Sequence, residues 1–536
     1  MKALLYITVF VLYASNARAA TYYLSPDTGD LSNAGTMNAP WPGLQEVLDA
    51  GYISTQEYIG LPFDSLTSTL VTKNTNGVVQ PGDTLILLSG YYGHVEIDRH
   101  YNEDYITVMS APSRSPILAS MHIRSCAKWR IIGLTIDASI DYEAAASRLI
   151  FVESHGFRGP SADVYIADCY LTSGPDGWDW TAEEWLARSR SGIYTTADRT
   201  KVDNNILENV DHAISLVANR CQAVDNRVIN FSGDGLRVLG SHLRVEGNTI
   251  KNCFKVDDNH DDALQSFTVD AAPSYDTIRS NIIINHEELS HPLAGPLQGI
   301  GCFDGPYHHW LVENNVISVN HWHGITFLGG YDCQIVNNTV LDPTPEIEPG
   351  ASWIRIADHK DGTPSANCSV INNVANKFVV DAATSNNIVL DDTDAYNQEF
   401  VDWLLYDFSL QPTSQLVDAG ATQGPAIDIV GTTRPQGAAN DIGAYEYAVS
   451  TASTSDQGNV SLSMHPNPTT LHIEILTTET LQSILLTDSQ SKRISPMIVR
   501  TSTGYHIDLQ GYPPGIYTIS YTSQTGSLNS RLIVLL

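Results

Sequence analysis

The chain has 536 residues, 17% of them charged and 42% hydrophobic, a composition typical of a folded protein rather than a disordered one. Its 29 Lys and Arg stand against 60 Asp and Glu, giving a net charge of -31 that argues against nucleic acid as a partner. An acidic polysaccharide is not excluded, because a local Arg cluster or bound Ca²⁺ can still receive its carboxylates.

Residues 1–19 have the pattern of a signal peptide. Lys2 precedes an apolar stretch over 4–13, and Ala17-Arg18-Ala19 has the small residues of a cleavage site. The apolar stretch is too short to span a bilayer, and no later segment has about 20 uninterrupted apolar residues. We therefore expect an exported chain without a transmembrane segment, and we expect it to be a monomer.

A helix and a solenoid are predicted next. The segment 41–50 suits a short amphipathic helix that caps the first coil, since an open solenoid end exposes unpaired strand edges. The solenoid is predicted over 20–447, followed by a Ser- and Thr-rich linker over 448–459. Short alternating strands then indicate a second all-β domain over 460–536.

The solenoid is predicted from a short phrase that occurs seven times, an Asn-containing turn followed by a β-branched or apolar residue. The copies are Asn204-Asn205-Ile206, Asn226-Arg227-Val228, Asn248-Thr249-Ile250, Asn281-Ile282-Ile283, Asn314-Asn315-Val316, Asn337-Asn338-Thr339-Val340 and Asn372-Asn373-Val374. From Asn205 to Asn373 the anchors are spaced 21, 22, 33, 34, 23 and 35 residues apart, which indicates coils of about 22 residues with outward loops. Asn tolerates the left-handed conformation of a tight bend, and β-branched residues favour the strand that follows. Each phrase is therefore predicted to be one corner of a parallel β-helix, whose coils stack about 4.8 Å apart.

Cysteine placement also follows the repeat. Seven cysteines cannot all pair, and no CxxC is present. Cys221, Cys333 and Cys368 each lie five residues before an anchoring Asn, so we expect small inward-packed side chains. A Cys333–Cys368 bridge is the main alternative, since their coils should be adjacent.

One strand per coil carries Gly or Ala followed by Ile or Leu, and these strands predict an aliphatic stack with a polar row on either side. The stack is Ile193, Ile214, Leu236, Leu264, Ile300, Ile325 and Ile354. The leading row is Ser191, His212, Asp234, Asp262, Gln298, His323 and Ser352. The following row is Tyr194, Ser215, Arg237, Gln265, Gly301, Thr326 and Arg355. Unlike polar side chains stacked in this way do not suit a purely structural face, so the rows predict a functional surface.

The densest group of candidate catalytic residues lies in the segment 257–262, Asp-Asp-Asn-His-Asp-Asp, one coil after Asp234. We expect Asp234, Asp261 and Asp262 to converge. Crowded carboxylates repel, so either one of them holds a proton or a cation lies among them. The candidate catalytic residues are Asp234, His260, Asp261, Asp262 and His323. The candidate cation is Ca²⁺, which prefers oxygen ligands, and its candidate ligands are Asp234, Asp258, Asp261 and Asp262.

Other polar and aromatic side chains are predicted to bind substrate around this surface. Two tryptophans of an insertion are expected to stack on sugar rings, or else to pack the insertion against the coils. The candidate substrate-binding residues are Trp178, Trp180, Arg237, Gln265, Gln298, Asp304, Trp322, Arg355 and Lys360. His321 and His323 alternate along a strand, but a zinc site would need a third convergent ligand.

The aspartate cluster and the His323-Gly324 pair resemble the polygalacturonase family of β-helix hydrolases, with Gln298 occupying the coil between them. This resemblance implies a right-handed solenoid of the pectin-lyase-like type, with two carboxylates as acid and base across a glycosidic bond. The chain also resembles β-helix pectate lyases and alginate- and chondroitin-type lyases. That resemblance implies Ca²⁺ and an arginine on the uronate carboxylate, and a base that removes the C5 proton for β-elimination. A C5-epimerase would begin with the same proton abstraction.

The C-terminal segment carries Pro466-Asn467-Pro468 at its entry, Pro514-Gly515-Ile516-Tyr517 in a later strand and an apolar chain end. It resembles the C-terminal sorting domain of the type IX (Por) secretion system of Bacteroidetes. The resemblance implies a small Ig-like β-sandwich, handling by the type IX machinery, and secretion or attachment at the outer-membrane surface. The alternative for this segment is a small binding module.

Taken together, these patterns predict an all-β exported protein that acts on polysaccharide. We favour a lyase cleaving a uronic-acid polymer. A hydrolase and a C5-epimerase are the enzymatic alternatives, and a non-catalytic surface glycan-binding protein or adhesin is the third.

Overall fold

The computed structural model describes residues 19–112, 114–269 and 271–448. In the C-terminal region it describes 463–465, 472–476, 483–488, 493–494, 497–500, 504–509, 512, 515–522 and 528–535. The predicted signal peptide and linker lie outside these residues, apart from Ala19 and Ala448. The predicted domain boundaries at 19 and 459 therefore stay predictions.

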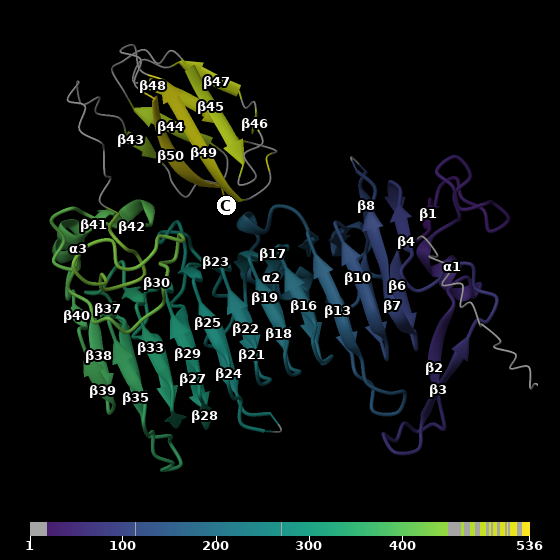
Figure 1. Ribbon diagram of the computed structural model, residues 1–536, viewed down its shortest axis with the longest axis horizontal. Helices are drawn as coiled ribbons and strands as arrows, with labels where there is room; N and C mark the ends of the chain where they lie inside the picture. Colours follow the sequence, from purple (N-terminus) through teal and green to yellow (C-terminus); the bar gives the residue numbers. More distant parts are fainter. Residues whose placement is uncertain are drawn as a thin grey trace, which may run out of the picture.

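Residues 21–389 form a parallel β-helix, in which each coil passes through three long sheets in turn (Figure 1). The first sheet runs through β1 (Thr21–Leu24), β4 (Thr84–Leu87), β7 (Tyr101–Ser110), β10 (Ala127–Ile132), β13 (Ala162–Ala167), β16 (Lys201–Asp203), β19 (Gln222–Val224), β22 (Arg244–Glu246), β25 (Thr277–Arg279), β29 (Leu311–Glu313), β33 (Gln334–Val336), β36 (Ser369–Ile371) and β39 (Ala383–Ser385). The antiparallel pair β2 (Thr55–Ile59) and β3 (Thr69–Lys73) joins it at β7. The second sheet comprises β5 (Gly90–Tyr91), β8 (Pro116–Leu118), β11 (Thr135–Asp137), β14 (Tyr170–Thr172), β17 (Ile206–Val210), β20 (Arg227–Phe231), β23 (Thr249–Cys253), β26 (Ile282–Ile284), β30 (Val316–Ser318), β34 (Thr339–Leu341), β37 (Val374–Ala375) and β40 (Ile388–Val389).

The third sheet is the one that carries the predicted functional rows. It comprises β6 (His94–Asp98), β9 (Ser120–Arg124), β12 (Arg148–Glu153), β15 (Ser191–Thr195), β18 (Ile214–Leu216), β21 (Leu236–Val238), β24 (Asp262–Phe267), β27 (Gln298–Asp304), β31 (His323–Leu328), β35 (Trp353–Ala357) and β38 (Lys377–Val380). The predicted aliphatic stack is confirmed, because Ile193, Ile214, Leu236, Leu264, Ile300, Ile325 and Ile354 pair in that order and are buried. Their burial inside the coils provides the hydrophobic stabilisation of the solenoid.

The turn from the first to the second sheet, here called the ladder turn, has two residues in each of eight consecutive coils. The second residue is always a stacked asparagine: Asn205, Asn226, Asn248, Asn281, Asn315, Asn338, Asn373 and Asn387. Each Nδ2 donates to the Oδ1 of the next asparagine at 2.9–3.1 Å, and that Oδ1 also accepts from a backbone N–H of the preceding coil. The left-handed residue is the one before the stacked asparagine, such as Asp225, Gly247 or Ser280, so placing the stacked asparagine itself at the bend was wrong for the Asn226, Asn248 and Asn281 copies.

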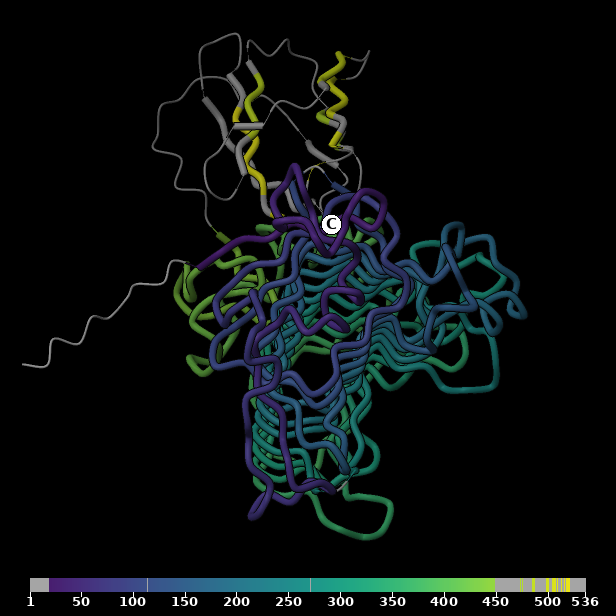
Figure 2. The backbone as a smooth tube through the Cα atoms, turned by 90° about the vertical axis from the view of Figure 1, so that its right-hand side faces the viewer, coloured from purple at the N-terminus to yellow at the C-terminus, as the bar shows by residue number. Residues whose placement is uncertain are grey.

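The turn from the second to the third sheet, here called the insertion turn, varies in length. It carries α2 (Ala182–Arg188) and η2 (Gly177–Asp179) between β14 and β15, η1 (Ala138–Ile140) after β11, and longer loops at 254–261, 285–297 and 342–352. Viewed along the solenoid, loops of intermediate sequence number project to one side of stacked coils that otherwise superimpose (Figure 2). The predicted pattern of a short coil with outward insertions is therefore confirmed.

The N-terminal end of the solenoid is capped, and near the other end a segment covers the outer face of the second sheet at Val316, Leu341 and Val374. At the N-terminal end, α1 (Leu44–Asp49) buries Leu44, Val47 and Leu48, as expected for the predicted cap. At the other end, α3 (Thr393–Glu399), β41 (Phe400–Asp402), η3 (Trp403–Leu405) and β42 (Asp407–Leu410) lead into a closing segment. That segment is held by the buried Arg434–Glu446 ion pair, 2.9 Å long, and by Asn337 Nδ2, which donates to the carbonyl of Gly443.

The described part of the C-terminal region contains two four-stranded antiparallel sheets. One joins β43 (Ser463–His465), β44 (His472–Leu476), β48 (Gly504–Asp508) and β47 (Met497–Arg500). The other joins β46 (Arg493–Ile494), β45 (Ser483–Asp488), β49 (Gly515–Thr522) and β50 (Leu528–Leu535). They share a core that includes Ile473, Leu486, Ile507 and Ile519. The region is all-β as predicted, and its assignment as Ig-like stays a prediction.

All seven cysteines are buried and free, which confirms the inward-packing prediction. Cys333 and Cys368 stack on adjacent coils, where the backbone N–H of Cys333 faces Cys368 Sγ at 3.4 Å, but they do not form the alternative bridge. No helix among the described residues is long and apolar enough to cross a membrane.

Candidate functional site

The outward face of the third sheet is hollowed where β24, β27 and β31 lie side by side. One hollow of about 260 Å³ is lined by His260, Gln265, Ser266, Phe267, Gln298, Phe303, Asp304, His323 and Lys360. A second, of about 240 Å³, is lined by Lys255, Asn259, His260, Asp261, Pro296, Gln298, His321 and Pro349. Because His260 and Gln298 line both, the two hollows form one candidate site.

Strand register brings the predicted rows onto this face. The following row is confirmed through Ser215, Arg237, Gln265, Gly301, Thr326 and Arg355. The leading row holds where Asp262 pairs with Gln298, but His323 pairs with Trp353 rather than Ser352. The shift comes from a register irregularity between His323 and Ile325, which the repeat could not reveal.

The three predicted aspartates are buried rather than displayed on the open face. The exposed fractions of Asp234, Asp261 and Asp262 are 1%, 1% and 0%. Asp234 Oδ1 accepts a hydrogen bond from the backbone N–H of Asp262 at 3.1 Å, so the aspartates do lie near one another. The expectation that all three would meet substrate on an open groove was nevertheless wrong, because burial leaves them to act mainly through the side chains they contact.

Asp262 holds an exposed histidine at the edge of the site. Its Oδ2 lies 3.6 Å from His260 Nδ1 and accepts from Gln265 Nε2 at 3.0 Å. Burial raises the pKa of Asp262 to about 6, and hydrogen bonding and charge from Asp262 raise the pKa of His260 above its ordinary value. The His260 side chain is 67% exposed, so it is open to a ligand while a buried carboxyl group orients it.

Gly301 makes room for this pair. A Cβ at Gly301 would lie 2.2 Å from Asp262 Oδ1, closer than any side chain could tolerate. Among the described residues, that oxygen is buried and has no hydrogen-bond partner. The lack of a side chain at this rung of the following row therefore allows Asp262 to point along the sheet.

Asp261, the last residue of the loop 254–261, lines the second hollow. Burial raises its pKa to about 7, and Lys255 Nζ, 3.6 Å from Asp261 Oδ2, acts in the opposite direction. Asn259 Nδ2 is 3.4 Å from the other carboxylate oxygen. A carboxyl group with such a pKa can hold or release a proton near neutral pH.

His321 and His323 supply two neutral imidazoles stacked with ring centroids 5.2 Å apart. Burial is the main cause that lowers their pKa values, to about 4 and about 3. His323 Nδ1 lies 3.3 Å from Trp353 Nε1, which can only donate, and 2.9 Å from Thr326 Oγ1. Nδ1 is therefore the acceptor, and Nε2 of His323 carries the proton.

The predicted arginines do not line the site. Arg237 Nε donates to the buried Asp234 Oδ2 at 2.7 Å, so its charge is already neutralised. The guanidinium of Arg355 lies over the Trp353 ring, 5.5 Å from its centroid. Lys360 is the cation that lines the first hollow, where it forms an exposed ion pair with Asp304.

Two of the three predicted tryptophans have structural roles. Trp180 is buried and, with Trp185 and Phe254, forms the core of the insertion, while Trp178 packs edge-on against Phe254. Predicting them as sugar platforms was therefore wrong, and their alternative role of packing the insertion is confirmed. Trp322 is 40% exposed and stacks on Trp353 at 5.8 Å, so its flat face stays available beside the site.

The predicted Ca²⁺ ligands do not form a cage. Across the residues that the structure describes, no group of three or more His, Cys, Asp or Glu is placed to hold a metal ion. Asp234 is occupied by Arg237, and Asp258 is exposed in the loop 254–261. The residues as they stand do not fit a resident metal.

Several lining residues were missed from the sequence. Lys255 and Asn259 share the acidic loop with His260, and that proximity in sequence was the available signal. Phe303 reaches His323, with ring centroids 4.8 Å apart, from a strand position that carries no motif.

Comparison with known proteins agrees with this architecture. Residues 191–394 match the family profile of the right handed beta helix region, and residues 463–535 match that of the secretion system C-terminal sorting domain. Comparison with curated proteins gave no match. The chain therefore carries a right-handed β-helix and a sorting domain, which indicates type IX secretion to the cell surface or exterior.

The chain is similar to several solved structures, among them the following three. Pectate lyase Pel9A is 14% identical, with a TM-score of 0.38, over 80% of this chain and 96% of that one. A rhamnogalacturonan lyase is 11% identical, with a TM-score of 0.40, over 72% and 91%. The A-module of the Azotobacter vinelandii mannuronan C-5 epimerase AlgE6 is 11% identical, with a TM-score of 0.29, over 57% and 90%.

Proposed function

We propose that this exported protein is a polysaccharide lyase that cleaves a uronic-acid polymer by β-elimination at the site around His260. The observation that carries the proposal is the exposed imidazole of His260 held by the buried Asp262. A carboxylate at Nδ1 keeps the proton there and leaves Nε2 free to accept another, as in other histidine–carboxylate pairs. The raised pKa of His260 makes it a stronger base than an isolated imidazole.

The chemistry assigns one step to each group. His260 Nε2 removes the proton at C5 of a uronate unit, and the electron pair forms the C4=C5 double bond as the C4–O bond breaks. His323 lines the same hollow, and its Nε2–H is proposed to donate a hydrogen bond to the leaving oxygen, which takes its proton from water. Lys360 offers its ammonium to the uronate carboxylate, because its ion pair with Asp304 is exposed and exchanges readily.

Ultraviolet absorbance tests the reaction type directly. The secreted protein is incubated with polygalacturonate, alginate and chondroitin, since an unsaturated uronate absorbs in the ultraviolet and a hydrolysis product does not. New reducing ends with rising absorbance support the lyase. Altered C5 configuration without new ends indicates an epimerase. Retention on a polymer with no chemical change indicates a surface glycan-binding protein.

The pH profile tests the base. A base must be unprotonated to act, so kcat/KM should rise with pH through a pKa above the ordinary imidazole value of about 6.5. In Asp262→Asn the carboxylate that raises the pKa of His260 is gone. The rising limb should therefore move to lower pH while the plateau rate falls. A limb that stays in place would remove His260 from the proposed role.

Glycoside hydrolysis is the second candidate, and one observation favours it. Asp261 and Asp262 have pKa values raised to about 7 and about 6, so one of the pair can serve as a protonated acid at neutral pH. New reducing ends without ultraviolet absorbance, lost in Asp261→Asn, would support this function over the lyase.

Calcium stays a proposal separate from these steps, since the described residues offer no cage for it. Chelation followed by Ca²⁺ addition is the test. Loss and recovery of cleavage would place an ion between the substrate carboxylate and the acidic loop 254–261, and an unchanged rate would show that none is needed.

A further inference from the structure

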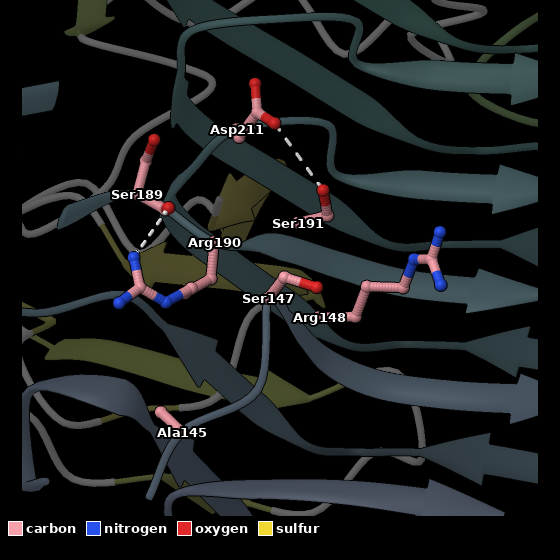
Figure 3. A pocket seen from close by; sticks show the side chains of 7 residues that line it. All are labelled: Ala145, Ser147, Arg148, Ser189, Arg190, Ser191 and Asp211. Carbon is pink, nitrogen blue, oxygen red and sulfur yellow. Dashed lines mark hydrogen bonds between the residues drawn. The ribbon is translucent and has the colours of Figure 1, made fainter. Parts of the chain in front are cut away.

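Another hollow, separate from the two of the candidate site, lies on the same face of the third sheet, several coils toward the N-terminus. It measures about 430 Å³ and is lined by Ala145, Ser147, Arg148, Ser189, Arg190, Ser191 and Asp211, from β12, β15 and the insertion turn (Figure 3). None of these residues belongs to the site around His260. Small and hydroxyl-bearing side chains leave the hollow open between two arginines.

Arg148 is fixed but not neutralised. Its guanidinium lies over the ring of Phe151 at 4.5 Å and over that of Tyr194 at 4.1 Å, measured to the centroids. Among the described residues it has no ion-pair partner, although the chain carries 60 acidic residues and only 29 Lys and Arg. Two aromatic faces hold the guanidinium in place by cation–π contacts, and its hydrogen-bond donors stay available.

The same aromatic rings form a platform along the sheet. His122 stacks on Phe151 at 4.8 Å, and Phe151 meets Tyr194 edge to face at 5.5 Å. The three residues occupy one row of paired strands, in which His122 pairs with Phe151 and Phe151 with Tyr194. That row continues as Ser215, Arg237 and Gln265 to the site around His260.

The other charged groups of the hollow define where an anion can lie. Arg190 Nη1 donates to the carbonyls of Ala187, Arg188 and Ser189, so this arginine anchors the end of α2. Asp211 Oδ2, 3.5 Å from the Ser191 hydroxyl, would repel an anion on its side. In Figure 3 the guanidinium groups of Arg148 and Arg190 lie on opposite sides of Ser147 and Ser191, which leaves the Arg148 side as the cationic one.

We propose that Arg148, Phe151 and Tyr194 form a distal subsite that binds an anionic sugar unit of a polysaccharide lying along the third sheet. Arg148 receives the carboxylate or sulfate group, and the aromatic row packs against the sugar rings. Tyr194 and Gln265 are three coil steps apart, about 14 Å at ordinary strand spacing. A chain that fills both places therefore needs several sugar units between them. The inference extends the proposed function but does not require that the polymer be cleaved.

Binding without turnover isolates the subsite. Affinity electrophoresis of His260→Gln compares gels that contain an unsulfated polyuronate, a sulfated neutral polysaccharide or a neutral polysaccharide. Adding Arg148→Gln should weaken retention by an anionic polymer about tenfold or more, the contribution of a hydrogen bond to a charged group. The polymer whose retention falls identifies carboxylate or sulfate as the ligand.

Two further variants serve as controls for this result. Arg220→Gln removes the same charge from an exposed position in another turn, and its retention should match the parent. Tyr194→Ala should also weaken retention. If this variant still melts cooperatively, it tests the subsite even where the Arg148→Gln protein folds poorly. The subsite is overturned if Arg148→Gln and Arg220→Gln are retained equally. It is also overturned if the parent retains a neutral polymer as strongly as an anionic one.

The subsite and the proposed function can fail separately. Retention that depends on Arg148 in a protein that cleaves nothing keeps the subsite and removes the lyase. Cleavage with a KM for long polymer that is unchanged in Arg148→Gln keeps the lyase and removes the subsite. If both hold, Arg148→Gln should raise KM for long polymers and leave the cleavage of short oligosaccharides unchanged.

Discussion

The ladder turn and the insertion turn lie at two corners of the same coils, yet they differ in every respect. The ladder turn has two residues in each of eight coils, and its second residue is always an asparagine that bonds to the next. The insertion turn ranges from one residue, at 376, to eighteen, at 173–190, and carries the acidic loop with His260. One corner thus maintains the stacking, and the other is free to vary and to carry chemistry.

The largest expected effect is a loss of activity from a substitution in the insertion turn. His260→Gln should lower kcat for polymer cleavage by about 10²–10⁴-fold, the usual contribution of a positioned general base. Because the side chain is 67% exposed, the melting temperature should change little. Steady-state rates and calorimetry on the same sample measure both quantities.

His309→Gln is the matched control, since His309 is a partly exposed histidine that lines neither hollow of the site. It should retain full activity. Equal losses in both variants would mean that histidine replacement acts through folding, and an active His260→Gln would remove the proposed base.

At the ladder turn the effect should fall on stability instead. Asn281→Ala leaves the backbone N–H and the Nδ2 of Asn248 buried without their acceptor. At about 1–3 kcal/mol for each of the two unsatisfied groups, the free energy of unfolding should fall by about 2–6 kcal/mol. Denaturant titration gives the value, and Asn76→Ala, at an exposed site, should change it by less than about 0.5 kcal/mol. A loss of similar size in both variants would contradict the ladder as a source of stability.

Gly301→Ala tests how closely the site depends on the third sheet, which follows the insertion turn. The new Cβ must displace both Asp262 Oδ1 and the Phe303 ring, which would lie at 2.2 Å and 2.5 Å. Misplacing the carboxylate that orients His260 should lower kcat by about 10- to 100-fold. Gly156→Ala, where a Cβ meets nothing within 4 Å, should be fully active. An active Gly301→Ala would show that the position of Asp262 does not matter.

The smallest effect concerns Asp276, which follows the return from the third sheet to the first. Burial raises its pKa to about 8, while its Oδ1 accepts from the backbone N–H of Leu243. The folded state therefore keeps a proton that the unfolded chain loses near pH 4, so stability falls as pH rises from about 4 to 8.

Asp276→Asn imitates the neutral acid and removes this titration. It should change little below about pH 4, where both states hold the proton, and stabilise the protein by about 1 kcal/mol or more at pH 8. Thermal unfolding at the two pH values measures the difference. A decline with pH that is as steep in the variant as in the parent would exclude Asp276 as its cause.

Much of the solenoid could be predicted because repetition is visible in sequence. Asn205 to Asn373 mark seven coils and Ile193 to Ile354 mark the inner stack, and both were found from spacing alone. The eighth asparagine, Asn387, was missed because the last coil is short, only 14 residues after Asn373. The left-handed residue was misplaced in the copies with a single asparagine, because there the bend is formed by Asp225, Gly247 or Ser280, and no asparagine marks that position.

The site was less predictable, because burial and partners are not periodic. The following row was correct, and it brought Gln265 and Gly301 together. Nothing in the sequence indicated that Asp234 would bind Arg237 and so remove both from the site. Nor did it indicate that Trp180 would be buried, since an aromatic residue in an insertion serves a core or a ligand equally well.

The asparagine side chains all point the same way, each donating toward the coil that follows. A coil added or removed as a unit would leave this polarity unbroken if it brings its own asparagine in the same place. The length of the molecule is therefore adjustable in whole coils, and with it the length of polymer that the proposed function would span.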